Sequence, residues 1–171
     1  MTREASRSVA IAPITIEEAD GLARRMAWRQ PSRHLERAVG QRGGRGLYLI
    51  AWCGGAPVGH SFVKWPGDLS SRQARAERCA EVEDLFVVPD HRGDGIGTAL
   101  LEASEQAARE AGHDTIGLAV ALDNEGARRL YARRGYRDAA QGVFTLRWTS
   151  LDDQGVERTW REMCTYLVKD L

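Results

Sequence analysis

The stretch best suited to chemistry is a glycine-rich turn between an apolar strand, expected at residues 82–88, and a helix, expected at residues 98–111. Glycine lacks the Cβ atom that keeps a ligand away from the backbone, and it permits positive φ. The first N–H groups of the helix have no partner inside it and lie at the positive end of its dipole. The turn therefore predicts a pyrophosphate-binding site. Its expected binding residues are Arg92, Gly93, Asp94, Gly95, Ile96, Gly97 and Thr98.

Two common phosphate-binding motifs do not match this turn. A P-loop requires a Gly-Lys pair, which occurs nowhere in the chain. A dinucleotide-binding fingerprint that begins at Gly93 requires glycine or alanine at the position of Thr98. The pattern that fits is R-x-x-G-x-G, formed by Arg92, Gly95 and Gly97. A glycine turn that binds nothing is the alternative, and the turn alone does not decide between the two.

A second candidate segment, residues 124–136, reads Asn-Glu-Gly-Ala-Arg-Arg-Leu-Tyr-Ala-Arg-Arg-Gly-Tyr. Asn124 is a residue type that caps helices. Ala127, Leu130 and Tyr131 are spaced i, i+3 and i+4, which places them on one helix face. Taken alone, this spacing is also typical of a tyrosine packed in a core.

The turn pattern, together with N-x-x-A-x-x-L-Y followed by x-x-x-G-[FY] in the second segment, resembles the two signatures of the GNAT acetyltransferase superfamily. The resemblance covers residues 82–136 by motif and the remainder by the order of elements. It implies acetyl-CoA as cosubstrate, with its pyrophosphate on the turn, in a V-shaped opening between strands at 82–88 and 115–122. It also implies an N-acetyltransferase that moves the acetyl group to a primary amine by direct attack, without a metal.

Acetyl transfer to an amine requires loss of the amine proton, stabilisation of an oxyanion and protonation of the leaving thiolate. The resemblance gives the last role to Tyr131, since a phenol has an ordinary pKa of about 10, above that of a thiol. It places the oxyanion donors at the backbone N–H groups of Phe86 and Val87. The further cofactor contacts that it implies are Val88, Asn124, Ala127 and Tyr131.

Glu83 is the candidate base, because a carboxylate inside so apolar a strand is costly unless it is used or paired. It shares a strand face with Leu85 and Val87, whereas Asp84 faces the other side. The two acids are similar to an acidic pair in polyamine and aminoglycoside acetyltransferases. Pairing with a loop arginine is the alternative for both and is favoured for Asp84, and an amine that binds deprotonated needs no base. A lone strand histidine such as His60 is more typical of a structural or exposed residue than of a proton relay.

The charges around the motifs point to two classes of acceptor. Acidic residues from Glu81 to Asp84 suit a cationic small molecule such as a polyamine or aminoglycoside, whereas arginines in the first helix and in segment 66–80 suit an anionic or peptide acceptor. Acetylation of a protein N-terminus or lysine is an alternative function. A non-catalytic acetyl-CoA-binding regulatory domain is another.

The composition is ordinary for one soluble globular domain. The 171 residues, 43% hydrophobic and 28% charged, are expected to form a single domain over residues 1–171. With 24 basic and 24 acidic residues the net charge is zero, so no global field recruits nucleic acid or an anionic membrane. Three scattered cysteines and an N-terminus without a signal peptide fit a protein of the reducing cytoplasm. A homodimer is compatible with these features.

The expected fold is α/β: a mixed, mostly antiparallel sheet of six to seven strands flanked by about four helices, in the GNAT order. In the strand at 115–122, alternate residues are glycine or alanine, and this minimal face predicts the close approach of a helix or a ligand. The expected strands are 9–14, 47–53, 58–65, 82–88, 115–122, 143–150 and 157–168, and the expected helices are 15–29, 32–39, 98–111 and 125–134.

Overall fold

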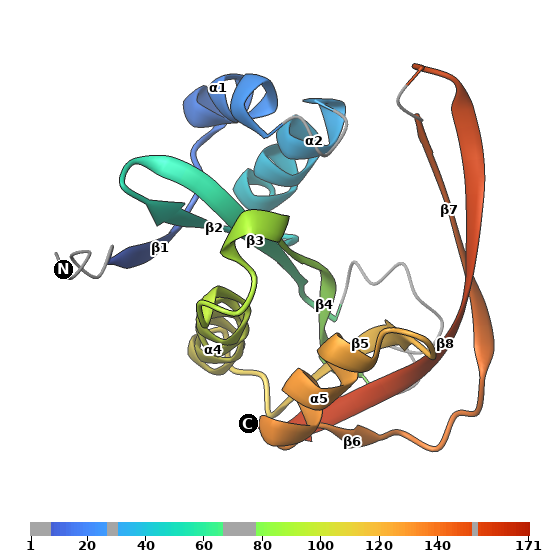
Figure 1. Ribbon diagram of the computed structural model, residues 1–171. Helices are drawn as coiled ribbons and strands as arrows, with labels where there is room; N and C mark the ends of the chain where they lie inside the picture. The colour runs from blue at the N-terminus through green and yellow to red at the C-terminus, as the bar shows by residue number, and fades with distance from the viewer. Residues whose placement is uncertain (1–7, 27–30, 67–77, 152–153) are drawn as a thin grey trace, which may run out of the picture. The chain divides into compact units, whose positions relative to one another are not determined.

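The computed structural model describes residues 8–26, 31–66, 78–151 and 154–171. These residues form a mostly antiparallel sheet of eight strands with four α-helices and one short 3-10 helix (Figure 1). The predicted α/β class is confirmed, and the strand count is slightly higher than the expected six to seven. The additional strand is β6 (Arg137–Asp138), whose two residues are too few to produce an alternating pattern in the sequence.

The chain divides into two compact units. The first comprises Met1–Val63 and Asp84–Ala107, and the second comprises Lys64–Glu83 and Ala108–Leu171. Strand β4 (Ala80–Val87) passes from the second unit into the first. The expectation of one domain over the whole chain remains a prediction.

The sheet of the first unit contains β1 (Val9–Pro13), β2 (Gly46–Cys53), β3 (Ala56–Lys64, of which all but the last residue belong to this unit) and the second half of β4, in that order. Strand β1 pairs with β2 in antiparallel register and lies at the end of the sheet order, as its proline predicts. Strands β2 and β3 are neighbours joined by a tight turn, in which Gly54 and Gly55 both have positive φ, as a type I′ turn requires.

One helix precedes the gap at residues 27–30, and a second helix follows it. Helix α1 (Ile16–Arg25) begins at Thr15 with a capping box: the Thr15 hydroxyl accepts from the Glu18 N–H, and the Glu18 carboxylate accepts from the Thr15 N–H. It ends four residues before the expected end, and residues 27–30 lie outside the described part. Helix α2 (Pro31–Arg42) begins one residue before the expected 32–39, because proline is compatible with the first helical position, and it continues three residues beyond the expected end.

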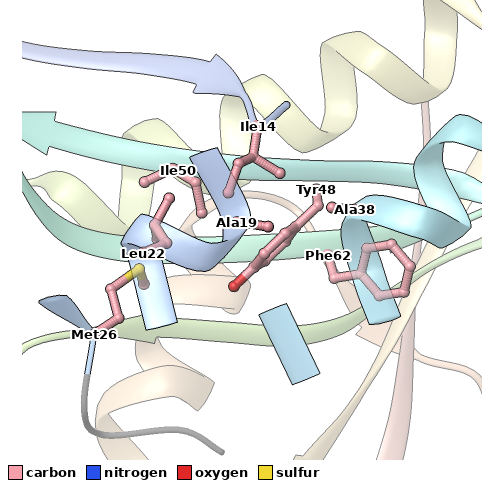
Figure 2. Close-up of a cluster of buried hydrophobic side chains, with 8 residues drawn as sticks. All are labelled: Ile14, Ala19, Leu22, Met26, Ala38, Tyr48, Ile50 and Phe62. Carbon is pink, nitrogen blue, oxygen red and sulfur yellow. The ribbon is translucent and has the colours of Figure 1, made fainter. Parts of the chain in front are cut away.

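One face of this sheet packs against α1 and α2. The Tyr48 ring lies at the centre of the apolar cluster and meets the Phe62 ring edge-on, with 5.9 Å between centroids. Each apolar side chain removed from water here favours folding by roughly 1.5–3 kcal/mol. Figure 2 shows the buried members of this cluster: Ile14, Ala19, Leu22, Met26, Ala38, Tyr48, Ile50 and Phe62.

The opposite face packs against the first three turns of helix α4 (Ile96–Glu110). A Cβ at Gly59 would lie 2.7 Å from the Phe86 oxygen and 3.2 Å from Leu100, so only glycine lets β3 approach β4 and α4 this closely. The hydroxyls of Ser61 and Ser104 satisfy each other at 2.9 Å across the same contact. The end of β4, which carries the expected site, packs against this same cluster through Leu85, Val87 and Val88.

The second unit contains the first half of β4, then β5 (Thr115–Ala121), β8 (Glu157–Asp170) and β6, and β7 (Phe144–Leu151) also pairs with β8. Strand β5 pairs with β8 along its whole length. At Gly117 the minimal face of β5 is met by a side chain of the neighbouring strand: a Cβ there would lie 2.6 Å from the Tyr166 ring of β8. Tyr166 is the diagonal cross-strand neighbour of Gly117, and such neighbours are within reach of aromatic side chains.

None of the helices in the described residues is both long and apolar enough to cross a membrane.

Candidate active site

The glycine turn joins β4 to α4 within the first unit. A 3-10 helix, η1 (Pro89–His91), follows the strand. Gly93 and Gly95 have φ values of +92° and +81°, which side chains with a Cβ rarely adopt. Beyond the chain neighbours, no described heavy atom lies within 4 Å of a Cβ built at either glycine. The backbone conformation, and not a lack of space, therefore explains these two glycines.

The amides at the start of α4 are arranged as an anion site requires. The Ala99 N–H donates to the Gly95 oxygen at 3.0 Å, which marks the first turn of the helix. The N–H groups of Ile96, Gly97 and Thr98 come before this bond, so the helix itself does not use them. They lie at the positive end of the helix dipole, where an anion is stabilised.

Arg92 is bound back onto the strand that precedes it. Its Nε donates to the Val87 oxygen at 3.0 Å, and its guanidinium lies 5.6 Å from the centroid of the Phe86 ring. The side chain is exposed. The sequence predicted Arg92 as a pyrophosphate-binding residue, and the structure shows a second role, because Arg92 also connects the turn to the end of β4.

The hydrogen bonds at the end of β4 distinguish the two expected oxyanion donors. The Val88 N–H donates to the Val58 oxygen of β3 at 3.0 Å. Because N–H groups alternate sides along a strand, the Phe86 N–H points to the same side as that of Val88, and the Val87 N–H points away from β3. The Val87 oxygen accepts from Arg92 on that other side, which agrees with this alternation. Val87 is therefore the better-placed donor of the two.

Glu83, the candidate base, belongs to the second unit and has a lysine partner. Its carboxylate lies 2.5 Å from Lys64 Nζ at the end of β3, and its side chain is 28% exposed. The alternative foreseen from the sequence was an arginine of segment 66–80, most of which lies outside the described residues. Among the described residues, the cation beside Glu83 is the strand lysine Lys64.

Asp84 is paired with an arginine, as favoured from the sequence, and this arginine, Arg37, comes from α2. Most of the loop whose arginines were expected lies outside the described residues. Arg37 Nη2 lies 2.7 Å from Asp84 Oδ2, and His60 Nε2 lies 3.1 Å from the same oxygen. Burial by itself would lower the pKa of Arg37, but the charge of Asp84 and the contact with Tyr48 outweigh it, so this pKa is raised. The guanidinium of Arg37 is therefore charged although it is mostly buried.

His60 is neither exposed nor a lone residue, and here the sequence reasoning missed a cluster. Its ring is fully buried and stacks on Phe86, with 5.8 Å between centroids. A second buried histidine, His34, lies 2.7 Å from the Tyr48 hydroxyl. Histidine, tyrosine and arginine at these positions had no spacing pattern to connect them, because they come from α2, β2 and β3.

Tyr131 lies on helix α5 (Glu125–Arg133) in the second unit. It is buried, and its ring centroid lies 5.8 Å from that of Tyr136. The Asn124 side chain caps the helix by accepting from the Ala127 N–H at 3.1 Å. Asn124 and Ala127, expected as cofactor contacts, thus also have a structural reason for their identity.

Comparison with known proteins gives a family for this arrangement. The model of the acetyltransferase (GNAT) family matches residues 15–136. An uncharacterised N-acetyltransferase from Methanocaldococcus jannaschii is 34% identical over 95 residues, which are 53% of this chain and 39% of the relative. An aminoalkylphosphonate N-acetyltransferase from Salmonella typhimurium is 37% identical over 59 residues, 34% of this chain and 38% of that protein. The chain spans less than half the length of the curated relatives it matches.

Solved structures extend the likeness over nearly the whole fold. An acetyltransferase from Salmonella typhimurium, solved with its cofactor acetyl-CoA, aligns with a TM-score of 0.67 over 96% of this chain and 94% of that one. The two sequences are 17% identical, so the likeness concerns the fold alone. It agrees with the fold class predicted from the motifs and the order of elements.

Proposed function

Because the chain belongs to the GNAT acetyltransferase family, we propose that it transfers the acetyl group of acetyl-CoA to the primary amine of a small molecule by direct attack. The turn between β4 and α4 carries this proposal. Two glycines with positive φ place the start of α4 after the strand, and three amides at that start are not used by the helix. These residues fit a pyrophosphate, which acetyl-CoA would supply together with the reactive thioester.

Two groups of the chain complete the proposed chemistry. The Val87 N–H, directed away from β3, stabilises the oxyanion that forms when the amine attacks the thioester carbonyl. Tyr131, assigned by the family resemblance, donates its phenolic proton to the departing thiolate. Glu83 removes the amine proton, because only a neutral amine can attack the thioester.

The acceptor is proposed as an ordinary primary amine and not as a polycation. The argument for a polycation rested on the acids near the end of β4. Two of these, Glu83 and Asp84, lie against Lys64 and Arg37, so each acid stands beside a compensating positive charge. A relative named as an aminoalkylphosphonate N-acetyltransferase supports the inclusion of small anionic amines among the candidates.

A thiol-release assay with acetyl-CoA tests this function against amines, aminoglycosides, aminoalkylphosphonates, amino acids and peptides. The cysteines of the chain, Cys53, Cys79 and Cys164, are buried, so the background from the protein is expected to be low. Release with peptides alone would favour protein acetylation. Heat of binding without release across the panel would favour a regulatory domain, and no heat from coenzyme A or acetyl-CoA would overturn the proposal.

A matched pair of variants tests the turn itself. Gly95→Ala and Gly44→Ala both place a Cβ at a positive φ, +81° and +72° respectively, in open space. Each is expected to cost stability by roughly 1–2 kcal/mol through the same backbone strain. Only Gly95→Ala should also lose acetyl-CoA binding, measured by calorimetry. Equal binding by the two variants would remove the turn from the cofactor site.

A further inference from the structure

The outer half of the β7–β8 hairpin is an exposed arm. Strand β8 is buried at residues 164–168, where it pairs with β5, and exposed at every residue from 157 to 163, where it pairs with β7. In Figure 1 this arm extends well beyond α5 and the other strands of its own unit. A two-stranded ribbon with both faces in water is marginally stable on its own.

The arm carries most of the large apolar side chains that the described residues expose. Five of the eight lie between residues 143 and 163, and they include Trp160 at 46% exposed and Met163 at 53%. Met163 lies opposite Thr145 and on the other face from Trp160 and Leu146, so these residues are divided between the two faces. Several exposed apolar side chains on one segment mark an interaction site more often than an isolated apolar residue does. The full set is Val143, Leu146, Val156, Trp160 and Met163.

The register separates the two faces of the arm. Residues directly opposite each other lie on the same face, so one face holds Trp148 with Trp160 and Leu146 with Glu162. Arg158 lies on this face too, because alternate residues of a strand share a face. The face is therefore an apolar centre, Trp148 and Trp160, with an acid on one side and a base on the other.

The charges on this face are complementary to those of a second copy. Glu162 and Arg158 lie two residues to either side of Trp160 along β8. A two-fold axis at Trp160 places Glu162 of each copy against Arg158 of the other. The two resulting contacts lie on either side of the Trp160 side chains. The other face lacks this property, since Arg147 lies opposite Arg161 and a two-fold mate would add two more guanidinium groups.

We propose that the Trp148–Trp160 face of the β7–β8 arm is a homodimer interface, in which the arms of two copies of this chain pack antiparallel around Trp160. The pairing is isologous and needs no other partner. It would cover the aromatic pair and bring together two Glu162–Arg158 ion pairs. It is independent of the proposed acetyl transfer, since it uses none of the residues of the glycine turn or of α5.

Charge reversal tests the geometry most sharply. Glu162→Arg alone and Arg158→Glu alone should each weaken self-association in sedimentation equilibrium, because each sets two like charges against each other. The double variant, Glu162→Arg with Arg158→Glu, exchanges the charges and should restore the dimer. A dimer unaffected by the single changes, or a double variant weaker than both, would overturn the proposal.

Truncation of the central residue gives the second test. Trp160→Ser should weaken the dimer at least ~30-fold, as expected for a buried aromatic residue at the centre of an interface. Thr159→Ser changes the neighbouring residue on the opposite face and should leave it intact. Acetyl-CoA binding and melting temperature, measured in parallel, show that the variants are folded. Wild-type protein that stays monomeric up to high concentration would overturn the proposal. The Trp148–Trp160 face would then be assigned to contact with a different protein.

Discussion

The carboxylate of Asp84 and the guanidinium of Arg37 form a 2.7 Å ion pair that connects β4 to α2, with side chains only 16% and 8% exposed. Asp84 belongs to the second half of β4, which leads into the glycine turn. His60 shares the same carboxylate oxygen and stacks on Phe86. A buried polar cluster thus supports, from the side of α2, the strand that carries the proposed oxyanion donor.

Replacing Arg37 tests how much this cluster contributes to folding. Arg37→Met should lower the free energy of unfolding by about 3 kcal/mol, because it leaves a mostly buried carboxylate without its arginine. Arg42→Met, on an exposed residue of the last turn of the same helix, should change it little. Urea denaturation of both variants provides the measurement. Equal midpoints would mean that water replaces the arginine at no cost.

Gly59 is expected to tolerate no side chain. Gly59→Ala places a Cβ 2.7 Å from the Phe86 oxygen, and overpacking of this kind typically costs about 1–3 kcal/mol. Gly21→Ala is the control, since a Cβ there meets no described atom within 4 Å and alanine is the better helix former, so this change should stabilise α1. Thermal melts should therefore shift in opposite directions. A neutral Gly59→Ala would show that β3 and β4 can separate without loss.

The role of Tyr131 is tested by removing a single oxygen. Tyr131→Phe should lower turnover at least ~10-fold, since general-acid help is commonly worth 10²–10⁴. The ring stays in place against Tyr136, so the affinity for acetyl-CoA should be nearly unchanged. Steady-state rates and calorimetry separate the two effects. Unchanged turnover would remove this phenol from the mechanism, and a loss of affinity would make it a binding residue.

Glu83 and Lys64 are best changed one at a time. If Glu83 takes the amine proton, Glu83→Gln should lower kcat/KM by roughly 10²-fold at neutral pH, and supplying the amine at a pH where it is already neutral should recover part of this loss. Lys64→Met keeps the carboxylate and removes its 2.5 Å partner, so it should retain most of the activity. A Glu83→Gln enzyme with full activity would mean that the amine binds deprotonated and needs no base.

Cys164 should react slowly with alkylating reagents. Burial raises the pKa of its thiol, and the nearby charge of Glu162 raises it further, so the reactive thiolate is scarce at neutral pH. Alkylation followed by peptide mapping should show the rate increasing only above the ordinary thiol range. Glu162→Gln should increase the rate at a given pH. Rapid labelling at neutral pH would indicate that the arm opens next to this residue.

The features that the sequence predicted correctly depend on neighbours along the chain. Two glycines of the turn have positive φ, and Asn124 caps α5 through the Ala127 amide. Each of these interactions closes within a few residues, so spacing alone reveals it. The same holds for the order of elements, which follows from local periodicity.

Only the tertiary structure decided which residues pair with the polar side chains and which side chain packs against Gly117. Arg37 and Asp84 are 47 residues apart, and the Tyr166 ring that covers Gly117 arrives from another strand. The sequence showed that the acids of β4 needed partners and that β5 had a minimal face. It did not identify Lys64, Arg37 or Tyr166, because sheet register and helix packing bring distant residues together and local pattern carries no record of that register.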